Sequence, residues 1–226
     1  RHEVEYNLML LKELDCSWKT PLEMCIDISP EDEFAAGNLI ESLKWHSGEE
    51  LVILHPGSGG SAREWPAENF AVLASKLIAE RNAKILITGV KGDEEKARKI
   101  VEASRNTAVS VVGKLRLKEL AALIRRSSLF ISNSTGPIHI AAAVGTPVVG
   151  LYPQITPMSA ARWGPCTEKK RVLVPRKPVD CKECVPKRGD PCACMASISV
   201  DEVSGAAADL LSKAIDAEKG MSVHGR

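Results

Sequence analysis

The stretch LVILHPGSGGSAREWPAENFAVLASKLI, residues 51–78, decides the fold. It starts with four apolar residues (51–54), continues through a glycine-rich segment and ends with apolar residues at helical spacing from Phe70 to Ile78. A short apolar run without polar alternation is typical of a strand that is buried on both faces, as in a parallel sheet. The stretch therefore predicts a strand, a loop and a helix, in that order.

The same alternation continues to residue 152. Further apolar runs of strand length lie at residues 84–88, 109–112, 129–132, 148–152 and near 171–174. Stretches with helical spacing separate the five runs from 51–54 to 148–152. Five strands that alternate with four helices are typical of a doubly wound domain. The predicted fold class is α/β, a Rossmann-like parallel sheet with helices on both faces. Additional helices are predicted at residues 3–14, 31–46 and 200–217.

Composition and charge exclude several classes of protein. The chain is 44% hydrophobic and 26% charged, which excludes disordered and collagen-like proteins. Its 30 Lys and Arg against 29 Asp and Glu leave a net charge of +1, so no nucleic-acid partner is expected. No apolar run approaches the ~20 residues that a membrane-spanning helix needs.

The loop after the first predicted strand is a candidate phosphate site, because open α/β sheets bind ligands at the carboxyl ends of their strands. Residues 55–66 place three glycines, two serines and Arg63 just before a helix. Backbone N–H groups and a cation in such a place can bind phosphate. The loop lacks the Gly-Lys-Ser/Thr of a Walker loop and the Gly-x-Gly-x-x-Gly of a dinucleotide site. A flexible turn with a surface arginine is the alternative interpretation.

The segment SNSTGPIHIAAA, residues 132–143, follows the fourth predicted strand. Thr135 is a suitable N-cap and Pro137 suits the first turn of a helix. The small apolar residues that follow indicate a buried helix, whose N–H groups and positive dipole end would face the ligand crevice. His139 lies on the same face as Thr135 and either faces a ligand or is a core histidine.

Acidic residues follow the second predicted strand at Asp93, Glu94 and Glu95. A carboxylate in this place can bind the hydroxyls of a ribose. Carboxylates also stabilise the first turn of a helix, and the residues alone favour this second interpretation.

Four of the seven cysteines, Cys181, Cys184, Cys192 and Cys194, lie in one short segment. An odd total with one tight cluster indicates a reduced protein, so the cytoplasm is the expected compartment. Four thiolates are enough for a structural zinc ion. Free thiols and a disulfide are the alternatives.

The segments at 55–66 and 132–147 together resemble glycosyltransferase family 9, the family of lipopolysaccharide heptosyltransferases, which use ADP-heptose. The resemblance covers roughly residues 1–215. It implies the two-domain GT-B architecture, with this chain as the C-terminal, donor-binding half. Residues 49–217 would form the Rossmann-like domain, with a cysteine-rich loop at 178–196 and a flexible tail at 218–226. Residues 1–48 would be the interdomain segment and the tail of an acceptor-binding domain that also holds the general base.

The resemblance implies roles on the phosphate side of a donor site. Gly57 and Ser58 would contact the diphosphate or the adjoining sugar. Arg63, where family members often have lysine, would neutralise the leaving diphosphate. Thr135 and Gly136 would present N–H groups to the phosphates.

Further roles follow from the same resemblance. Glu94 or Glu95 would meet the nucleoside, Leu115 would line the base pocket, and His139 would lie near the phosphates. Ser134 stands where many heptosyltransferases have aspartate, so nucleotide binding is implied more firmly than heptose specificity.

The activity that the resemblance implies is transfer of a sugar, heptose, from an ADP-linked donor to a lipopolysaccharide core or related glycan, with inversion. No cofactor or metal is expected to be required for catalysis. The lipid-linked acceptor would bind through the other domain, at the inner membrane, and this chain alone would bind the donor without useful turnover. A non-catalytic nucleotide-binding module and a GT-B relative such as a sugar-nucleotide epimerase are the alternatives.

Overall fold

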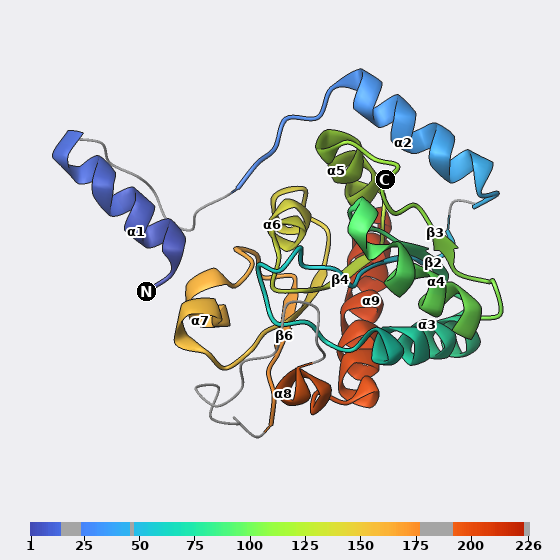
Figure 1. Ribbon diagram of the computed structural model, residues 1–226. Coiled ribbons are helices and arrows are strands. Elements are labelled where there is room, and N and C mark those ends of the chain that lie inside the picture. Colours follow the sequence, from blue (N-terminus) through green and yellow to red (C-terminus); the bar gives the residue numbers. More distant parts are fainter. Residues whose placement is uncertain (15–23, 46–47, 177–191, 224–226) are drawn as a thin grey trace.

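The computed structural model describes residues 1–14, 24–45, 48–176 and 192–223. Within them, six parallel strands form one sheet in the order β3-β2-β1-β4-β5-β6 (Figure 1). The strands are β1 (Leu51–His55), β2 (Lys84–Ile87), β3 (Val109–Ser110), β4 (Leu129–Asn133), β5 (Val148–Leu151) and β6 (Lys170–Leu173). The predicted α/β class and parallel sheet are confirmed.

Helices connect the strands and flank them at both chain ends. They are α1 (Glu3–Leu10), α2 (Pro30–Ser42), α3 (Ala67–Arg81), α4 (Glu94–Ala103), α5 (Leu117–Arg125), α6 (Gly136–Ala143), α7 (Ala160–Trp163), α8 (Ala193–Ala196) and α9 (Val200–Val223). Three short 3₁₀ helices are η1 (Leu11–Leu14), η2 (Lys91–Asp93) and η3 (Thr156–Met158).

The last helix is longer than the sequence predicts. The expected end was residue 217, but α9 continues to Val223 and takes in part of the segment 218–226 that was expected to be a tail. Its start is as predicted, because the Ser199 hydroxyl accepts the Glu202 N–H and the Glu202 carboxylate accepts the Ser199 N–H. Glu218 and Lys219 have high helix propensity and continue the helix, which also passes Gly220.

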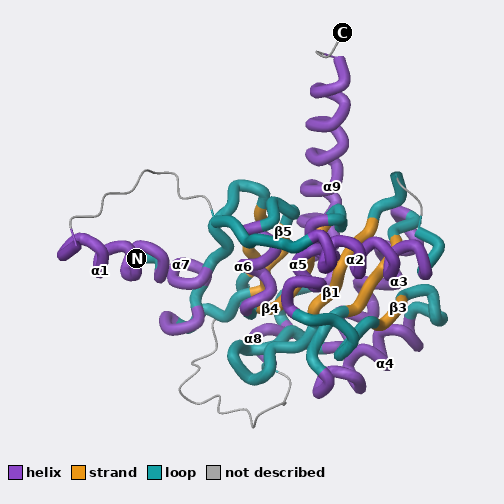
Figure 2. Tube along the Cα trace, turned by 90° about the horizontal axis from the view of Figure 1, so that it is seen from above, coloured by secondary structure: helices purple, strands orange, loops and turns teal. Residues whose placement is uncertain are grey.

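Two apolar clusters cover the two faces of the sheet. Successive side chains of a strand point to opposite faces, so Val52 and Leu54 belong to one cluster and Leu51 and Ile53 to the other. Helices α3, α4 and α9 pack on the first face, and α2, α5 and α6 pack on the second (Figure 2). The predicted helices on both faces are therefore confirmed.

The segment before β1 contacts the domain at two places. In α2, Ala36 and Ile40 are buried in the second cluster, so this helix is packed on the sheet domain. Helix α1 lies beside α7 (Figure 1), where His2 Nε2 is 2.7 Å from the Gly164 carbonyl oxygen.

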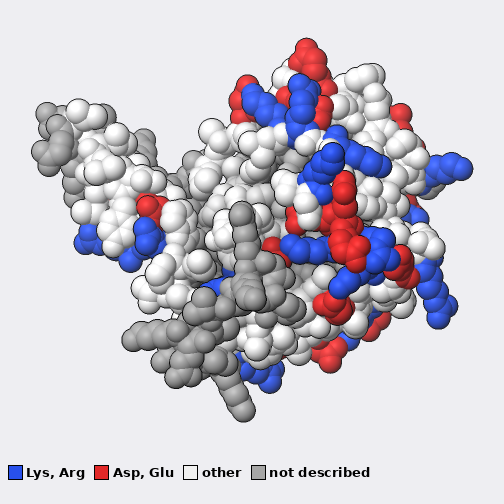
Figure 3. Space-filling view, viewed as in Figure 1, with Lys and Arg blue, Asp and Glu red and all other residues white. Residues whose placement is uncertain are grey.

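Charged side chains of both signs are interspersed on the face that carries α3 and α4 (Figure 3). Many of them are ion-paired, such as Lys99 with Glu68 at 2.9 Å. Among the described residues, no helix combines the length and the apolar character needed to cross a membrane.

Candidate functional site

The candidate site lies where β1 and β4 are neighbours at the centre of the sheet. After β1 the chain turns to α3 on one face, and after β4 it turns to α6 on the other. In open α/β sheets this reversal of strand order creates the crevice in which ligands bind. The loop 56–66 after β1 and the start of α6 after β4 lie at this point of the fold.

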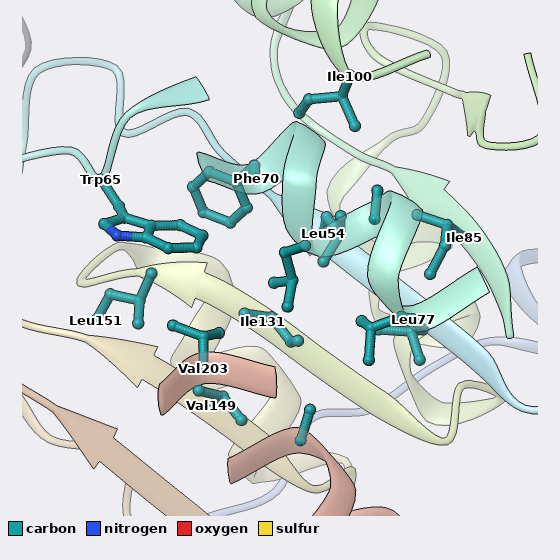
Figure 4. Close-up of a cluster of buried hydrophobic side chains, with 14 of the residues drawn as sticks. Leu54, Trp65, Phe70, Leu77, Ile85, Ile100, Ile131, Val149, Leu151 and Val203 are labelled. Atoms are coloured by element: carbon teal, nitrogen blue, oxygen red, sulfur yellow. The ribbon is translucent and has the colours of Figure 1, made fainter. Parts of the chain in front are cut away.

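Both ends of the loop 56–66 are held by one side chain of β4. The Asn133 Nδ2 donates to the Pro56 carbonyl at 2.7 Å, and Asn133 Oδ1 accepts the Trp65 N–H at 2.8 Å. Trp65 is itself buried and lies edge-on to Phe70 in the first cluster (Figure 4), with 4.8 Å between ring centroids. Its indole N–H donates to the carbonyl of Ile198 at 2.9 Å. The ends of the loop are therefore anchored in the core.

Within the loop 56–66, the Glu64 side chain accepts two hydrogen bonds. Its Oε1 accepts the N–H and the hydroxyl of Ser58, each at 2.8 Å, and lies 3.0 Å from Lys96 Nζ. Ser58, which the resemblance assigns to the diphosphate or the adjoining sugar, thus donates its N–H and its hydroxyl to a carboxylate of the protein. Arg63 is half-buried in the same loop.

Asp93 is a buried carboxylate beneath this loop. It accepts the Val90 N–H at 3.0 Å and lies 3.2 Å from Lys96 Nζ. A Cβ added to Gly57 would fall 2.1 Å from Asp93 Oδ2, so only glycine allows this approach at position 57. Lys96 thus joins Asp93 to Glu64 and links α4 to the loop.

His55, the last residue of β1, is a buried neutral histidine. Its Nδ1 lies 2.9 Å from the Thr88 hydroxyl, at the end of the neighbouring strand β2. Burial lowers the pKa of His55 to about 4, although the negative charge of Asp93 acts in the opposite direction. His55 therefore adds no charge to the site at neutral pH.

The start of α6 combines an exposed glycine, Gly136, with a buried hydroxyl, that of Thr135. Thr135 is the N-cap, as predicted, but its side chain makes no capping hydrogen bond. Its buried Oγ1 has no hydrogen-bond partner among the described residues. A Cβ at Gly136 would meet no atom within 4 Å, and the N–H of this first helical residue has no acceptor within the helix. At the helix start Gly136 is therefore exposed, whereas the Thr135 hydroxyl lies beneath the surface.

Ser134 and His139 lie on either side of this helix start. Burial raises the pKa of Tyr152, and a hydrogen bond from Ser134 partly offsets this effect. The Tyr152 hydroxyl donates to the Trp163 carbonyl at 2.8 Å. His139 is half-buried. Burial, and to a smaller extent the charge of His2, lower its pKa. Ser134 therefore lies near Tyr152, which contacts α7, and His139 lies near His2 at the start of α1.

The residues predicted to contact the nucleoside lie in two separate places. Glu94 and Glu95 are both exposed in the first turn of α4, and Glu95 pairs with Arg98 at 2.7 Å. Leu115 is half-buried and packs on the second apolar cluster. The carboxylate that faces inward after β2 is Asp93, not Glu94 or Glu95.

The cysteine cluster is described only in part. Cys181 and Cys184 lie outside the described residues, while Cys192 and Cys194 are buried in the first apolar cluster. In the described part of the chain no three His, Cys, Asp or Glu side chains are grouped as metal ligands. The zinc site at these four cysteines stays a prediction.

Comparison with known proteins gives the family. Residues 1–190 match the family model of glycosyltransferase family 9 (heptosyltransferase). The chain belongs to glycosyltransferase family 9. It is 32% identical over 112 residues to the lipopolysaccharide core heptosyltransferase OpsX of Haemophilus influenzae, covering 49% of this chain and 32% of that protein. It is also 30% identical over 132 residues to lipopolysaccharide heptosyltransferase 2 of Salmonella typhimurium, covering 54% and 36%.

Solved structures of family 9 proteins share the fold. A family 9 glycosyltransferase from Veillonella parvula superposes with a TM-score of 0.79 at 27% identity, over 94% of this chain and 61% of that one. The Escherichia coli ADP-heptose heptosyltransferase II superposes with a TM-score of 0.69 at 22% identity, over 87% and 56%. The chain thus spans about a third of the curated relatives it matches and just over half of these solved chains.

The sequence points to both segments of the candidate site but not to all the side chains that hold them. It gives no role to Asn133, Glu64 or Lys96, and it leaves Asp93 as either a ribose contact or a residue of a first helical turn. Several of the contacts join distant positions, such as Lys96 with Glu64, 32 positions apart, and Asn133 with Pro56, 77 positions apart. An asparagine at the end of a buried strand is the signal that could have pointed to Asn133, because buried amides need hydrogen-bond partners.

Proposed function

We propose that this chain binds the nucleoside diphosphate of a sugar donor between the loop 56–66 and the start of α6. The observation that carries the proposal is the buried Thr135 Oγ1, which has no hydrogen-bond partner among the described residues. A buried hydroxyl without a partner costs about 1–3 kcal/mol, so a bound phosphate oxygen that accepts its proton recovers this energy. The open Gly136 N–H beside it is a second donor to the same ligand.

Two positive groups of the site favour a diphosphate, while the nearby carboxylates of Glu64 and Asp93 are paired with Lys96. The start of α6 carries the positive end of the helix dipole, and Arg63 adds a full positive charge in the loop across the crevice. Contacts of this kind do not discriminate between bases, so they support a nucleoside diphosphate in general. Gly57 completes the phosphate side, and Ser58, whose N–H and hydroxyl donate to Glu64 in this structure, would have to release Glu64 to contact a phosphate. Glu94, Glu95 and Leu115 are the proposed contacts of the nucleoside.

Family membership supports an ADP-linked sugar as the donor, with heptose as the sugar. Among the structural neighbours, Escherichia coli heptosyltransferase WaaC has been solved with ADP and with ADP-2-deoxy-2-fluoro heptose. The proposed acceptor is a lipopolysaccharide core or related glycan, because the curated relatives are lipopolysaccharide heptosyltransferases. Since such acceptors are lipid-linked, the proposed location is the cytoplasmic surface of the inner membrane.

The proposed reaction is glycosyl transfer with inversion. An acceptor hydroxyl attacks the anomeric carbon while the bond from this carbon to the diphosphate oxygen breaks on the opposite face. Negative charge grows on the leaving diphosphate, so Arg63, Thr135 and the Gly136 N–H stabilise the transition state more than the ground state. The acceptor proton passes to a base outside the described residues. No metal or cofactor has a part in these steps.

Calorimetric titration of this chain with ADP, UDP and GDP tests the proposal. Wild type is expected to bind ADP most tightly, and Arg63→Ala and Thr135→Val are each expected to weaken ADP binding about tenfold or more, as for loss of a charge-assisted or buried hydrogen bond. Thr146→Val is the matched control, because it removes a buried threonine hydroxyl at the amino ends of the strands. There the Thr146 hydroxyl donates to the Ile124 carbonyl. Preference for UDP or GDP would overturn the ADP assignment, and no binding of any diphosphate would overturn the proposed site.

A further inference from the structure

We propose that Asn133 is a positioning residue that fixes the loop 56–66 relative to the start of α6, so that both act on one diphosphate. The proposal rests on the proposed function of the crevice. It adds a role for a side chain that no ligand needs to touch.

The two hydrogen bonds of Asn133 use both ends of its amide. The NH₂ group donates to Pro56 at 2.7 Å, and the oxygen accepts from Trp65 at 2.8 Å. Pro56 and Trp65 are the residues at which the loop leaves β1 and enters α3. One planar group therefore sets the distance between the two ends of the loop.

The same residue sets the position of the helix start. Asn133 is the last residue of β4, and its neighbours Ser134 and Thr135 lead directly into α6. Its side chain is fully buried. A shift of the loop relative to α6 would therefore break at least one of two buried hydrogen bonds.

The two hydrogen bonds of Asn133 matter because phosphate recognition depends on the relative position of the donors. The donors proposed for one diphosphate come from two segments separated by more than seventy positions in the chain, at Arg63 on one side and at Thr135 and Gly136 on the other. Hydrogen bonds weaken steeply with small changes in distance and angle. A displacement of about 1 Å at a site can cost on the order of a hundredfold in function.

Asn133→Asp affects the two hydrogen bonds differently. An ionised aspartate still accepts the Trp65 N–H, but its second oxygen faces the Pro56 carbonyl, which is also an acceptor, so the hydrogen bond to Pro56 is lost. A protonated aspartate donates to Pro56 and restores both bonds. Burial raises the pKa of a carboxyl group, so restoration is expected at mildly acidic pH.

The experiment combines hydrogen exchange with ADP titration on the 226-residue chain between pH 5 and pH 8. At pH 8, Asn133→Asp is expected to raise exchange of the Trp65 amide and of the loop, and to weaken ADP binding, each about tenfold or more relative to wild type. As the pH falls, the exchange rate and the ADP affinity of Asn133→Asp are both expected to approach the wild-type values. Asn133→Ala, which has no proton to regain, is expected to show the losses without recovery.

Thr146→Val provides the control for lost stability alone. It removes one buried hydrogen bond at the opposite edge of the sheet and is expected to leave loop exchange and ADP binding unchanged. The inference is overturned if wild type binds ADP and Asn133→Asp binds it equally well at pH 8, or if loop exchange stays at the wild-type rate. If wild type binds no diphosphate, the proposed function fails, while the exchange data still decide whether Asn133 holds the loop.

Discussion

The carboxylate of Asp93 lies directly against Gly57, so that a Cβ on Gly57 would fall 2.1 Å from Asp93 Oδ2. Asp93 belongs to the turn before α4, and Gly57 to the loop after β1. The contact joins the ends of β1 and β2 beneath the proposed diphosphate site. It also explains why a glycine is needed at this position, independently of any ligand.

Gly57→Ala is expected to destabilise the protein by about 1–3 kcal/mol, because the new methyl group overlaps a buried carboxylate. Chemical denaturation measures the change. Gly92→Ala is the control, since a Cβ at Gly92 would meet nothing within 4 Å. Removing the carboxylate in the double variant Gly57→Ala, Asp93→Ala is expected to relieve the clash, so that the two changes together cost less than their sum. Strict additivity would show that the contact does not limit position 57.

Gly136→Ala is expected to separate folding from ligand binding. The added methyl group enters open space at the start of α6, so the free energy of unfolding should stay the same or rise by up to about 1 kcal/mol. The same methyl group would occupy space that a bound phosphate needs, so ADP affinity should fall. Thermal unfolding and calorimetry on the same sample measure both quantities. Unchanged affinity would argue against phosphate at this helix start.

Lys96→Met tests the cation that joins Asp93 to Glu64. The change leaves the buried Asp93 carboxylate without its cation, and a loss of about 1–3 kcal/mol in the free energy of unfolding is expected, since Lys96 is partly exposed. Arg98→Met removes an exposed pair with Glu95 and Glu102 on the same helix and is expected to cost about 0.5 kcal/mol or less. Equal losses in the two variants would show that burial of Asp93 does not matter.

The stability of the protein should depend on pH through His55. Its pKa is about 4 in the folded protein and near 6.5 in the unfolded chain, so the unfolded chain binds more protons between these values. The contribution of neutral His55 is therefore fully present above about pH 6.5 and is lost as the pH falls to about 4, by at most about 3 kcal/mol. His55→Gln is expected to flatten this part of the curve of unfolding free energy against pH. A variant with the wild-type slope would show that other groups cause it.

The sequence predicted the central strands well because β1, β4 and β5 are buried along their whole length. Apolar runs such as residues 51–54 and 129–132 are typical of strands that helices cover on both faces. The end of α9 was predicted less well, since propensity alone gives no sharp stop before Val223. Helix boundaries depend on caps, and Ser199 with Glu202 marks the start but no comparable signal marks the end.

The candidate site was predictable in outline but not in detail. Glycines before a helix and the Ser-Thr-Gly segment point to the carboxyl edge of the sheet, because topology puts these segments there. Which carboxylate turns inward cannot be read from three adjacent acidic residues. In the structure Asp93 faces Gly57, whereas Glu95 turns outward to Arg98, and this choice depends on contacts between distant segments.

Titration of the ¹⁵N-labelled chain with ADP shows whether the loop 56–66 and the start of α6 hold one diphosphate. The largest amide shifts are expected to fall together at Ser58, Thr135 and Gly136, with one common dissociation constant. Largest shifts at the opposite edge of the sheet, near Leu51 and Lys84, would contradict it. Shifts in only one of the two segments would contradict the shared site as well.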